Sequence, residues 1–144
     1  MNDTPRWSED FSVDNDLIDA QHRDLFALVA LISDLAAHPE PTPEDETAVA
    51  RALLALRNYV RVHFRDEEGL MAEAGYPDLI EHIEEHRTFA EWLSILEGAP
   101  RLPGYSFSET VRHMSRYLTD WLVDHVLGSD KRYVPYLKGK KPSS

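Results

Sequence analysis

The chain contains no cysteine among its 144 residues, and this absence removes several kinds of site at once. Disulfides, thiolate zinc sites and thiol nucleophiles all require cysteine, so none of them can form. A chain without cysteine is compatible with the reducing cytosol, and we expect a cytoplasmic protein. Any metal site must be built from histidine and carboxylate side chains.

Positive charge and long apolar runs are also scarce. The 15 lysine and arginine residues face 26 acidic residues, and the formal net charge of −11 argues against a surface that binds nucleic acid. No window approaches the roughly 18 apolar residues of a membrane-spanning helix. The first residues, MNDTPRWSEDFSV, lack the apolar core of a signal peptide. We therefore expect a soluble, unsecreted protein that binds neither membrane nor nucleic acid.

Proline and glycine are concentrated in short stretches that divide the chain into long helical segments. These stretches lie at residues 39–43, 75–77 and 98–104. Because the connections are short, neighbouring helices should run antiparallel. The expected helices lie near residues 15–38, 43–74, 77–97 and 106–127.

The predicted fold is all-α, an up-down-up-down antiparallel four-helix bundle formed by a single domain over residues 1–144. Residues 1–14 should form an N-terminal arm that precedes the bundle. After the fourth helix we expect a short C-terminal segment and then a flexible tail at residues 139–144.

Two helix starts carry capping signals. Thr42 is the expected N-cap of the second helix, with Pro43 at the first helical position and Asp45 placed to complete a capping box. Ser106 or Ser108 can cap the fourth helix.

Helical periodicity places histidine and glutamate on the apolar faces of these helices. In the second helix, the stretch HFRDEE puts His63 and Glu67 in the same stripe as the aliphatic residues before them. The same count places further histidines on the apolar faces of the other helices: His22, His82, His86 and His125. A buried polar group without a partner costs about 1–3 kcal/mol, so these side chains must meet partners.

A single histidine on an apolar face is usually a core residue that is bonded to a backbone carbonyl. Five such histidines from four helices favour a shared site instead. His38 and His113 are internal controls, because His38 lies at the frayed end of the first helix and His113 falls off the stripe of the fourth. We expect both of these side chains in solvent.

The spacing of the buried residues favours a metal site. Residues four apart on a helix lie on one face, about 6 Å apart, so their side chains can bind the same ion. His63 with Glu67 is one such pair, and His82 with His86 is another.

His125 and Asp130 are five residues apart, which on an ideal helix puts them roughly 140° out of phase. They can converge only if the backbone changes course near Gly128. Two interpretations remain open: Gly128 stops the helix and Ser129 caps a new one, or a π-bulge brings both residues onto one face.

The resulting donor set is five imidazoles and at most two carboxylates. This number of ligands exceeds what one zinc ion takes, but it suits two iron ions that share bridging carboxylates. Carboxylate-rich dinuclear sites of helix bundles use four glutamates and two histidines, so this set is richer in nitrogen.

The ordered motifs resemble those of hemerythrin, and specifically the single-domain bacterial hemerythrins, over essentially the whole chain. They are IDAQH at 18–22, HFRDEE at 63–68, HIEEH at 82–86 and WLVDHVLGSD at 121–130. The resemblance implies two iron ions (Fe2+/Fe3+) joined by a bridging oxo or hydroxo group. It assigns His82, His86 and His125 to one iron, His22 and His63 to the other, and Glu67 and Asp130 to both as bridges.

The resemblance also implies a dioxygen pocket over the iron that has two histidines. The residues expected to form it are Leu25, Phe64, Phe89, Trp121 and Leu122, with Tyr133 close to the Asp130 end. Ordinary core packing explains the same six residues, and the two interpretations are compatible.

Residues around the motifs have simpler expected roles. Trp7 and Phe11 on the N-terminal arm should cover a helix end. Asp19 and Gln21 flank His22 and can orient an imidazole through its second nitrogen. The acidic residues Glu84 and Glu85 should face solvent.

The motifs leave no free general acid or base, since every histidine on the apolar stripes is assigned as a ligand. The leading hypothesis is therefore reversible dioxygen binding, for storage, transport or delivery to an oxygen-using enzyme, rather than catalysis. One alternative is a di-iron peroxidase, oxidase or nitric-oxide-consuming enzyme, which needs an electron supply and a substrate opening. Another is an oxygen or redox sensor. The sequence ends 14 residues after Asp130, so we expect any signalling output to lie on a separate protein.

Overall fold

The computed structural model describes residues 6–37, 42–98 and 104–137. The four long helices are α1 (Asp16–Ala36), α2 (Pro43–Ala74), α3 (Leu79–Gly98) and α4 (Phe107–Asp124). α4 continues through a π-helical segment, η2 (His125–Asp130), into α5 (Lys131–Leu137), and a short 3-10 helix, η1 (Glu9–Phe11), lies in the N-terminal arm.

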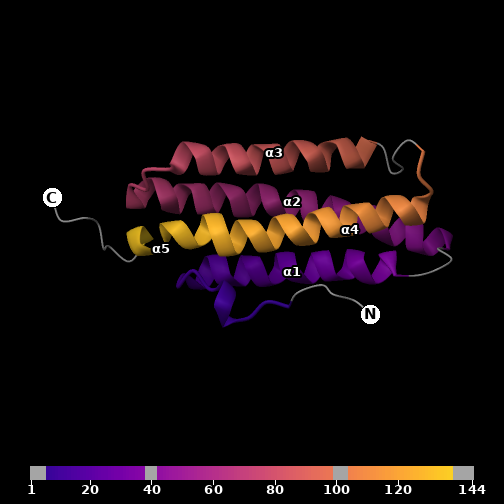
Figure 1. Cartoon of the computed structure of the whole chain (residues 1–144), viewed down its shortest axis with the longest axis horizontal. Coiled ribbons are helices and arrows are strands. Elements are labelled where there is room, and N and C mark those ends of the chain that lie inside the picture. The colour runs from indigo at the N-terminus through magenta and orange to yellow at the C-terminus, as the bar shows by residue number, and fades with distance from the viewer. Residues whose placement is uncertain (1–5, 38–41, 99–103, 138–144) are drawn as a thin grey trace.

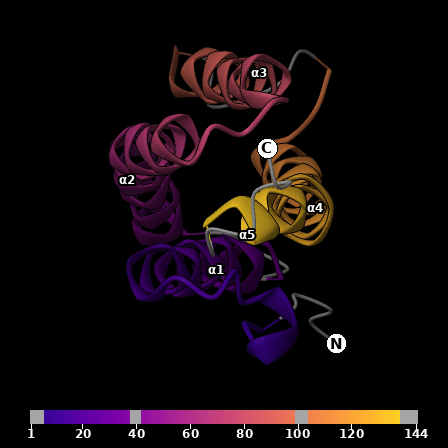
Figure 2. The same ribbon diagram turned by 90° about the vertical axis from the view of Figure 1, so that its left-hand side faces the viewer.

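The long helices lie side by side and alternate in direction along the chain (Figure 1). Seen from the end, α1 lies between α2 and α4, and α3 lies beside α2 on the side away from α1 (Figure 2). The predicted antiparallel four-helix bundle is therefore confirmed.

Apolar side chains fill the interior in two clusters. The larger cluster draws on all four long helices and includes Ile32, Leu56, Leu93 and Leu118, each at most 1% exposed. The smaller cluster lies towards the α5 end and consists of Val13, Ile18, Met71, Tyr76 and Tyr133. On α1, His22 falls between the two clusters, and on α2 Glu67 does the same, with His63 beside the last residue of the larger cluster, so a polar layer interrupts the core.

The helix ends follow the local sequence signals. Thr42 and Asp45 form a reciprocal capping box, in which each backbone N–H donates to the other side chain at 2.9 and 3.1 Å. Ser106, rather than Ser108, caps α4 in the same way with Glu109. Gly75 ends α2 with a φ of 71°, the left-handed conformation that favours glycine.

Two helix boundaries differ from expectation. α3 begins at Leu79 rather than near residue 77, because the chain first turns after Gly75, and its first capping hydrogen bond runs from the His82 N–H to the Asp78 carbonyl. The fourth helix does not end near residue 127. Gly128 lies inside η2 and has no positive φ, so the helix-stop interpretation is wrong and the π interpretation is confirmed.

The N-terminal arm packs along the side of α1 rather than over a helix end, which corrects the expectation for Trp7 and Phe11. Phe11 is buried and meets Phe26 edge to face, with ring centroids 4.7 Å apart. The Arg23 guanidinium lies 4.1 Å above the centre of the Trp7 ring, a cation–π contact. Neither aromatic side chain of the arm contributes to the polar layer.

Asp19 fixes the end of this arm. Its carboxylate accepts hydrogen bonds from the Ser12 hydroxyl at 2.6 Å and from the Val13 N–H at 2.9 Å. The Lys131 ammonium donates to the Ser12 carbonyl at 2.7 Å and ties the arm to α5. The expectation that Asp19 orients an imidazole is therefore wrong, because its oxygens are used by the arm.

Two expectations fall outside the part of the chain that the structure describes: the exposure of His38 and the flexible tail at 139–144. Within residues 6–37, 42–98 and 104–137, no helix combines the length and the apolar character that crossing a membrane requires.

Candidate metal centre

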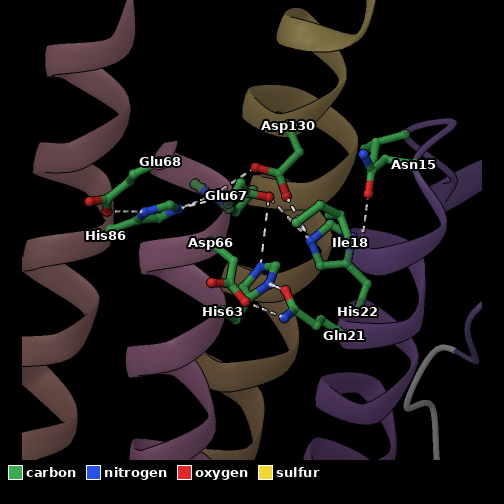
Figure 3. Close-up of polar contacts among 12 residues, drawn as sticks. Asn15, Ile18, Gln21, His22, His63, Asp66, Glu67, Glu68, His86 and Asp130 are labelled. Carbon is green, nitrogen blue, oxygen red and sulfur yellow. Dashed lines mark hydrogen bonds and ion pairs between the residues drawn. The ribbon is translucent and has the colours of Figure 1, made fainter. Parts of the chain in front are cut away.

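Side chains from α1, α2, α3 and η2 converge in the polar layer (Figure 3). The five histidines, Glu67 and Asp130 are each at most 5% exposed. Their potential ligand atoms form two groups, and within each group all atoms lie within 4.8 Å of one another. One group is His82, His86, His125, Glu67 and Asp130, and the other is His22, His63 and Glu67.

Glu67 lies between the two groups. Its Oε1 is 3.0 Å from His86 Nε2 and 3.2 Å from His82 Nε2. Its Oε2 is 3.5 Å from His22 Nε2 and 3.7 Å from His63 Nε2. Each carboxylate oxygen therefore faces a different group, which is the arrangement that a bridging carboxylate needs.

Asp130 repeats this arrangement from the other side of the bundle. Its Oδ1 is 3.0 Å from the Nε2 atoms of both His82 and His125. Its Oδ2 is 3.1 Å from His22 Nε2. The π turn makes this possible, because it brings residue 130 onto the same side of the helix as residue 125.

Hydrogen bonding leaves part of this cluster unsatisfied. Both oxygens of Asp130 and both ring nitrogens of His22 are buried without a hydrogen-bond partner in the described part of the chain. Orphaned polar atoms of this kind cost about 1–3 kcal/mol each. A cation placed among them would satisfy three of these atoms, the two oxygens of Asp130 and Nε2 of His22, which lie close together.

The ring orientations of His86 and His125 also fit a metal. His86 Nδ1 is 2.7 Å from Glu68 Oε2, so this nitrogen carries the proton, and His125 Nδ1 lies 3.0 Å from Glu85 Oε2 as an ion pair that favours the same tautomer. The two Nε2 lone pairs then face each other at 3.0 Å. Two acceptors at this separation repel unless a proton or a metal ion lies between them.

Gln21 orients His63 in a similar way. The Gln21 amide nitrogen donates to Asp66 Oδ2 at 2.9 Å, which fixes the amide so that its oxygen lies 2.8 Å from His63 Nδ1. His63 is therefore protonated at Nδ1 and presents the Nε2 lone pair to the centre (Figure 3). The structure thus places Gln21 against an imidazole, that of His63 rather than that of its neighbour His22.

Sequence reasoning missed two of these supporting carboxylates. Glu84 is exposed and pairs with Arg87 at 3.3 Å, as a solvated face predicts. Glu85 is half-buried against His125, so its assignment to solvent was wrong. The contact of Glu68 with His86 was not predicted either. Both residues directly adjoin a ligand-type residue at the rim of the apolar stripe, and this position was the available signal.

The carboxylates control the imidazole pKa values in the metal-free protein. Burial alone would lower the pKa of His22 and of His82, but the close carboxylates of Asp130 and Glu67 raise each pKa to about 9. His63 lacks comparable support, and burial lowers its pKa to about 4.

The carboxylates shift in the opposite direction. Burial would raise the pKa of Glu67, but the neighbouring imidazoles, His63 foremost, hold it well below its usual value. Burial and the charge of Glu67 would raise the pKa of Asp130, but the neighbouring imidazoles, His125 foremost and then His22, outweigh both and lower it. Contact with His125 lowers the pKa of Glu85 to about 2. All three carboxylates are therefore ionised at neutral pH.

Tyr133 does not line the apolar cavity near the centre, contrary to its expected place in the pocket. It is fully buried, and its hydroxyl donates to Glu67 Oε2 at 2.8 Å. Burial and the charge of Glu67 raise the pKa of Tyr133 well above its usual value, so it remains a donor. Its role in the structure is to support a carboxylate.

The other five expected pocket residues share a wall. A small cavity of about 10 Å³, measured as the space open to the centre of a water-sized sphere, touches both the core and the centre. It is lined by Leu25, Phe64, Phe89, Trp121 and Leu122, together with His22, His63, His125, Val29, Leu56, Val60, Leu118 and Val126. Space of this size is close to the minimum that holds one water molecule.

Comparison with known proteins agrees with this geometry. Residues 13–137 match the hemerythrin HHE cation binding domain. The chain is 32% identical to a bacteriohemerythrin of Stenotrophomonas maltophilia over 133 residues, 92% of this chain and 80% of the relative. It is 34% identical to a hemerythrin subunit alpha of Lingula reevii over 134 residues, 93% of this chain and 92% of the relative. A crystal structure of wild-type hemerythrin matches with a TM-score of 0.76 at 29% identity, covering 92% of this chain and 97% of the other. The chain belongs to the hemerythrin family.

Proposed function

We propose that this chain binds dioxygen reversibly at a di-iron centre and serves oxygen storage, transport or delivery. The proposed ligands are His22, His63, Glu67, His82, His86, His125 and Asp130. The observation that carries the proposal is the position of an apolar cavity directly against a pair of ligand groups that share Glu67 and are also joined by the contact of Asp130 with His22. When bound, the iron pair would supply the electrons that dioxygen takes up and returns.

The two ligand groups are unequal, and this inequality supports a binding position beside the cavity. Three imidazoles serve one group and only His22 and His63 serve the other. Both of these histidines line the cavity, whereas His125 is the single member of the other group that does. The group with fewer protein ligands therefore faces the space where a small molecule fits.

The wall of the cavity suits holding dioxygen more than converting it. Apart from three histidines that are proposed ligands, no side chain that lines the cavity is ionisable. The hydroxyl of Tyr133 is turned to Glu67 and is not part of the wall. An apolar wall excludes water and proton donors, which favours release of the bound molecule unchanged.

One spectroscopic experiment tests the proposal. Protein expressed with ample iron should contain two irons per chain, and the reduced protein should develop an oxygen-dependent absorption band that disappears under argon. Elemental analysis that gives one metal per chain would contradict the dinuclear centre. Steady consumption of dioxygen and reductant, with no reversible band, would favour an enzyme instead.

Replacing a wall residue tests the closed cavity. Leu122 is 6% exposed and touches the cavity without belonging to the ligand set. Leu122→Ala should keep the iron, cost about 2–5 kcal/mol of stability and speed irreversible oxidation in air, because water and protons gain access. Leu54 is 50% exposed, so Leu54→Ala is the control that should oxidise at the wild-type rate. Equal oxidation rates in all three proteins would contradict the role of the wall.

A further inference from the structure

The two sides of the centre differ in what lies behind their imidazoles. We call His82, His86 and His125 the three-histidine half, and His22 and His63 the two-histidine half. Behind the three-histidine half, Glu68 Oε2 lies 2.7 Å from the Nδ1 of His86, and Glu85 Oε2 lies 3.0 Å from the Nδ1 of His125. Two of its three imidazoles therefore have a carboxylate in contact with Nδ1.

Among the described residues, no carboxylate directly contacts a ring Nδ1 of the two-histidine half. His63 Nδ1 meets the neutral amide oxygen of Gln21 at 2.8 Å. The nearby carboxylate of Asp66 is bound to the amide nitrogen of Gln21 and reaches His63 only through that amide. His22 Nδ1 is buried and has no hydrogen-bond partner among the residues that the structure places.

This difference changes the donor strength of the imidazoles. A carboxylate that accepts the Nδ1 proton increases the electron density at Nε2 and makes the ring a stronger ligand. A neutral amide has a weaker effect, and a ring without an acceptor receives none. Glu68 and Glu85 also bring two negative charges to one side, with side chains that are 28% and 43% exposed and so remain partly solvated.

We propose that Glu68 and Glu85 make the three-histidine half the side that holds the ferric charge when the protein is oxidised by one electron. The inference rests on the di-iron centre of the proposed function and states which of its two halves loses an electron first. An outer-sphere oxidant such as ferricyanide takes one electron and becomes ferrocyanide, and no bond forms or breaks in the protein. The two-histidine half, which adjoins the cavity, then keeps the ferrous charge.

The wild-type protein gives the first test. Protein labelled with 15N-histidine is oxidised by one equivalent of ferricyanide under argon, and electron–nuclear double resonance counts the ring nitrogens on the ferric ion. Three strongly coupled nitrogens are expected. Two such nitrogens, or an equal mixture, would overturn the proposal.

Single substitutions give the second test. In Glu68→Gln and Glu85→Gln, the preference of the three-histidine half for ferric over ferrous iron should fall on the order of tenfold. A tenfold fall raises a one-electron potential by about 59 mV, which a mediated titration under argon detects. Glu84→Gln is the matched control, since Glu84 is exposed and pairs with Arg87 rather than with a ligand. An equal shift in the control would show a general charge effect and would overturn the proposal.

A charge-neutral exchange completes the design. The double substitution Gln21→Glu with Asp66→Asn moves a carboxylate behind His63 without changing the net charge. It should make the halves more alike and lower the share of ferric ions that show three nitrogens. An unchanged share in a protein that retains two irons would overturn the proposal, and this holds even where Glu68→Gln fails to bind iron.

These measurements use no dioxygen, so the two proposals fail separately. A ferric ion confined to the three-histidine half, in a protein without a reversible oxygen band, would contradict only the proposed function. A reversible band in a protein with equivalent halves would contradict only the role of Glu68 and Glu85.

Discussion

His63 and His113 have the same side chain, and their surroundings decide what each can do. His63 is 1% exposed, is oriented by Gln21 and points its free nitrogen at Glu67. His113 is exposed, and its ring meets the ring of Tyr105. An imidazole that is buried and held by a second hydrogen bond loses little freedom when it binds a metal.

The first prediction compares these two histidines. His63→Ala removes one of the two imidazoles of the two-histidine half, so the iron content should fall from two towards one per chain. His113→Ala should leave the iron content unchanged. Elemental analysis of both proteins after identical purification decides the matter, and a loss of iron in His113→Ala would show that burial on the apolar stripe does not identify the ligands.

The second prediction concerns Tyr133. Tyr133→Phe keeps the ring but removes the donor to Glu67 Oε2, a carboxylate oxygen with no access to water. The loss should cost about 1–3 kcal/mol in the free energy of unfolding of the iron-free protein, measured with urea. Tyr105→Phe serves as the control, because Tyr105 is 43% exposed. Equal stability of the two variants would mean that the buried hydrogen bond contributes nothing.

The sequence predicts the location of the proposed ligands better than that of their supports. A ligand on a helix is found by residue type and helical phase together, as for His82 and His86. The contacts of Glu68 and Glu85 depend on which neighbouring helix faces the rim of the stripe, and helical phase alone does not specify this. The position of Tyr133 outside the cavity wall is hard to predict for a related reason, since it depends on how the chain continues beyond the π turn.

At the scale of helices, the fold follows from signals that act locally. Capping residues and the left-handed glycine mark helix ends through backbone hydrogen bonds that involve only nearby residues. The course of the chain after residue 124 could not be predicted in this way. A helix stop and a π turn both bring residues 125 and 130 together, and the same sequence signal, Gly128, is compatible with each.

The third prediction tests the π segment by changing its length. Residues five apart in a π turn occupy nearly the same relative positions as residues four apart in an α-helix, which lie about 40° apart. Deletion of Gly128 should therefore restore a regular α-helix, keep Asp130 beside His125 and retain two irons per chain. Insertion of one alanine after Gly128 should turn Asp130 away and lower the iron content.

Gly128→Ala is the control for chain length. A Cβ at this position meets nothing within 4 Å, and the backbone has no positive φ. Alanine should therefore be accommodated and stabilise the helix by about 0.5–1 kcal/mol through reduced freedom of the unfolded chain. Loss of iron in the deletion variant, with iron retained in Gly128→Ala, would show that the bulge itself is required.

At the scale of the whole molecule, the bundle encloses a charged layer inside an apolar core. In the metal-free protein, His22 and His82 have pKa values of about 9, and that of His125 is well above its usual value. These three imidazoles are protonated at neutral pH, while Glu67 and Asp130 are ionised. Protons therefore occupy the positions between donor atoms that a metal pair would take.

The last prediction follows from this competition. Iron must displace the protons on His22, His82 and His125, so binding releases protons and the apparent affinity rises with pH. Each displaced proton contributes up to a tenfold gain per pH unit, and the gain should level off as the pH passes about 9, where the imidazoles of His22 and His82 lose their protons without iron. Ferrous uptake is measured under argon against a chelator of known pH dependence, with a dye in weak buffer to count released protons. Iron uptake that is independent of pH between 7 and 9, with no proton release, would mean that these three imidazoles carry no protons before iron binds.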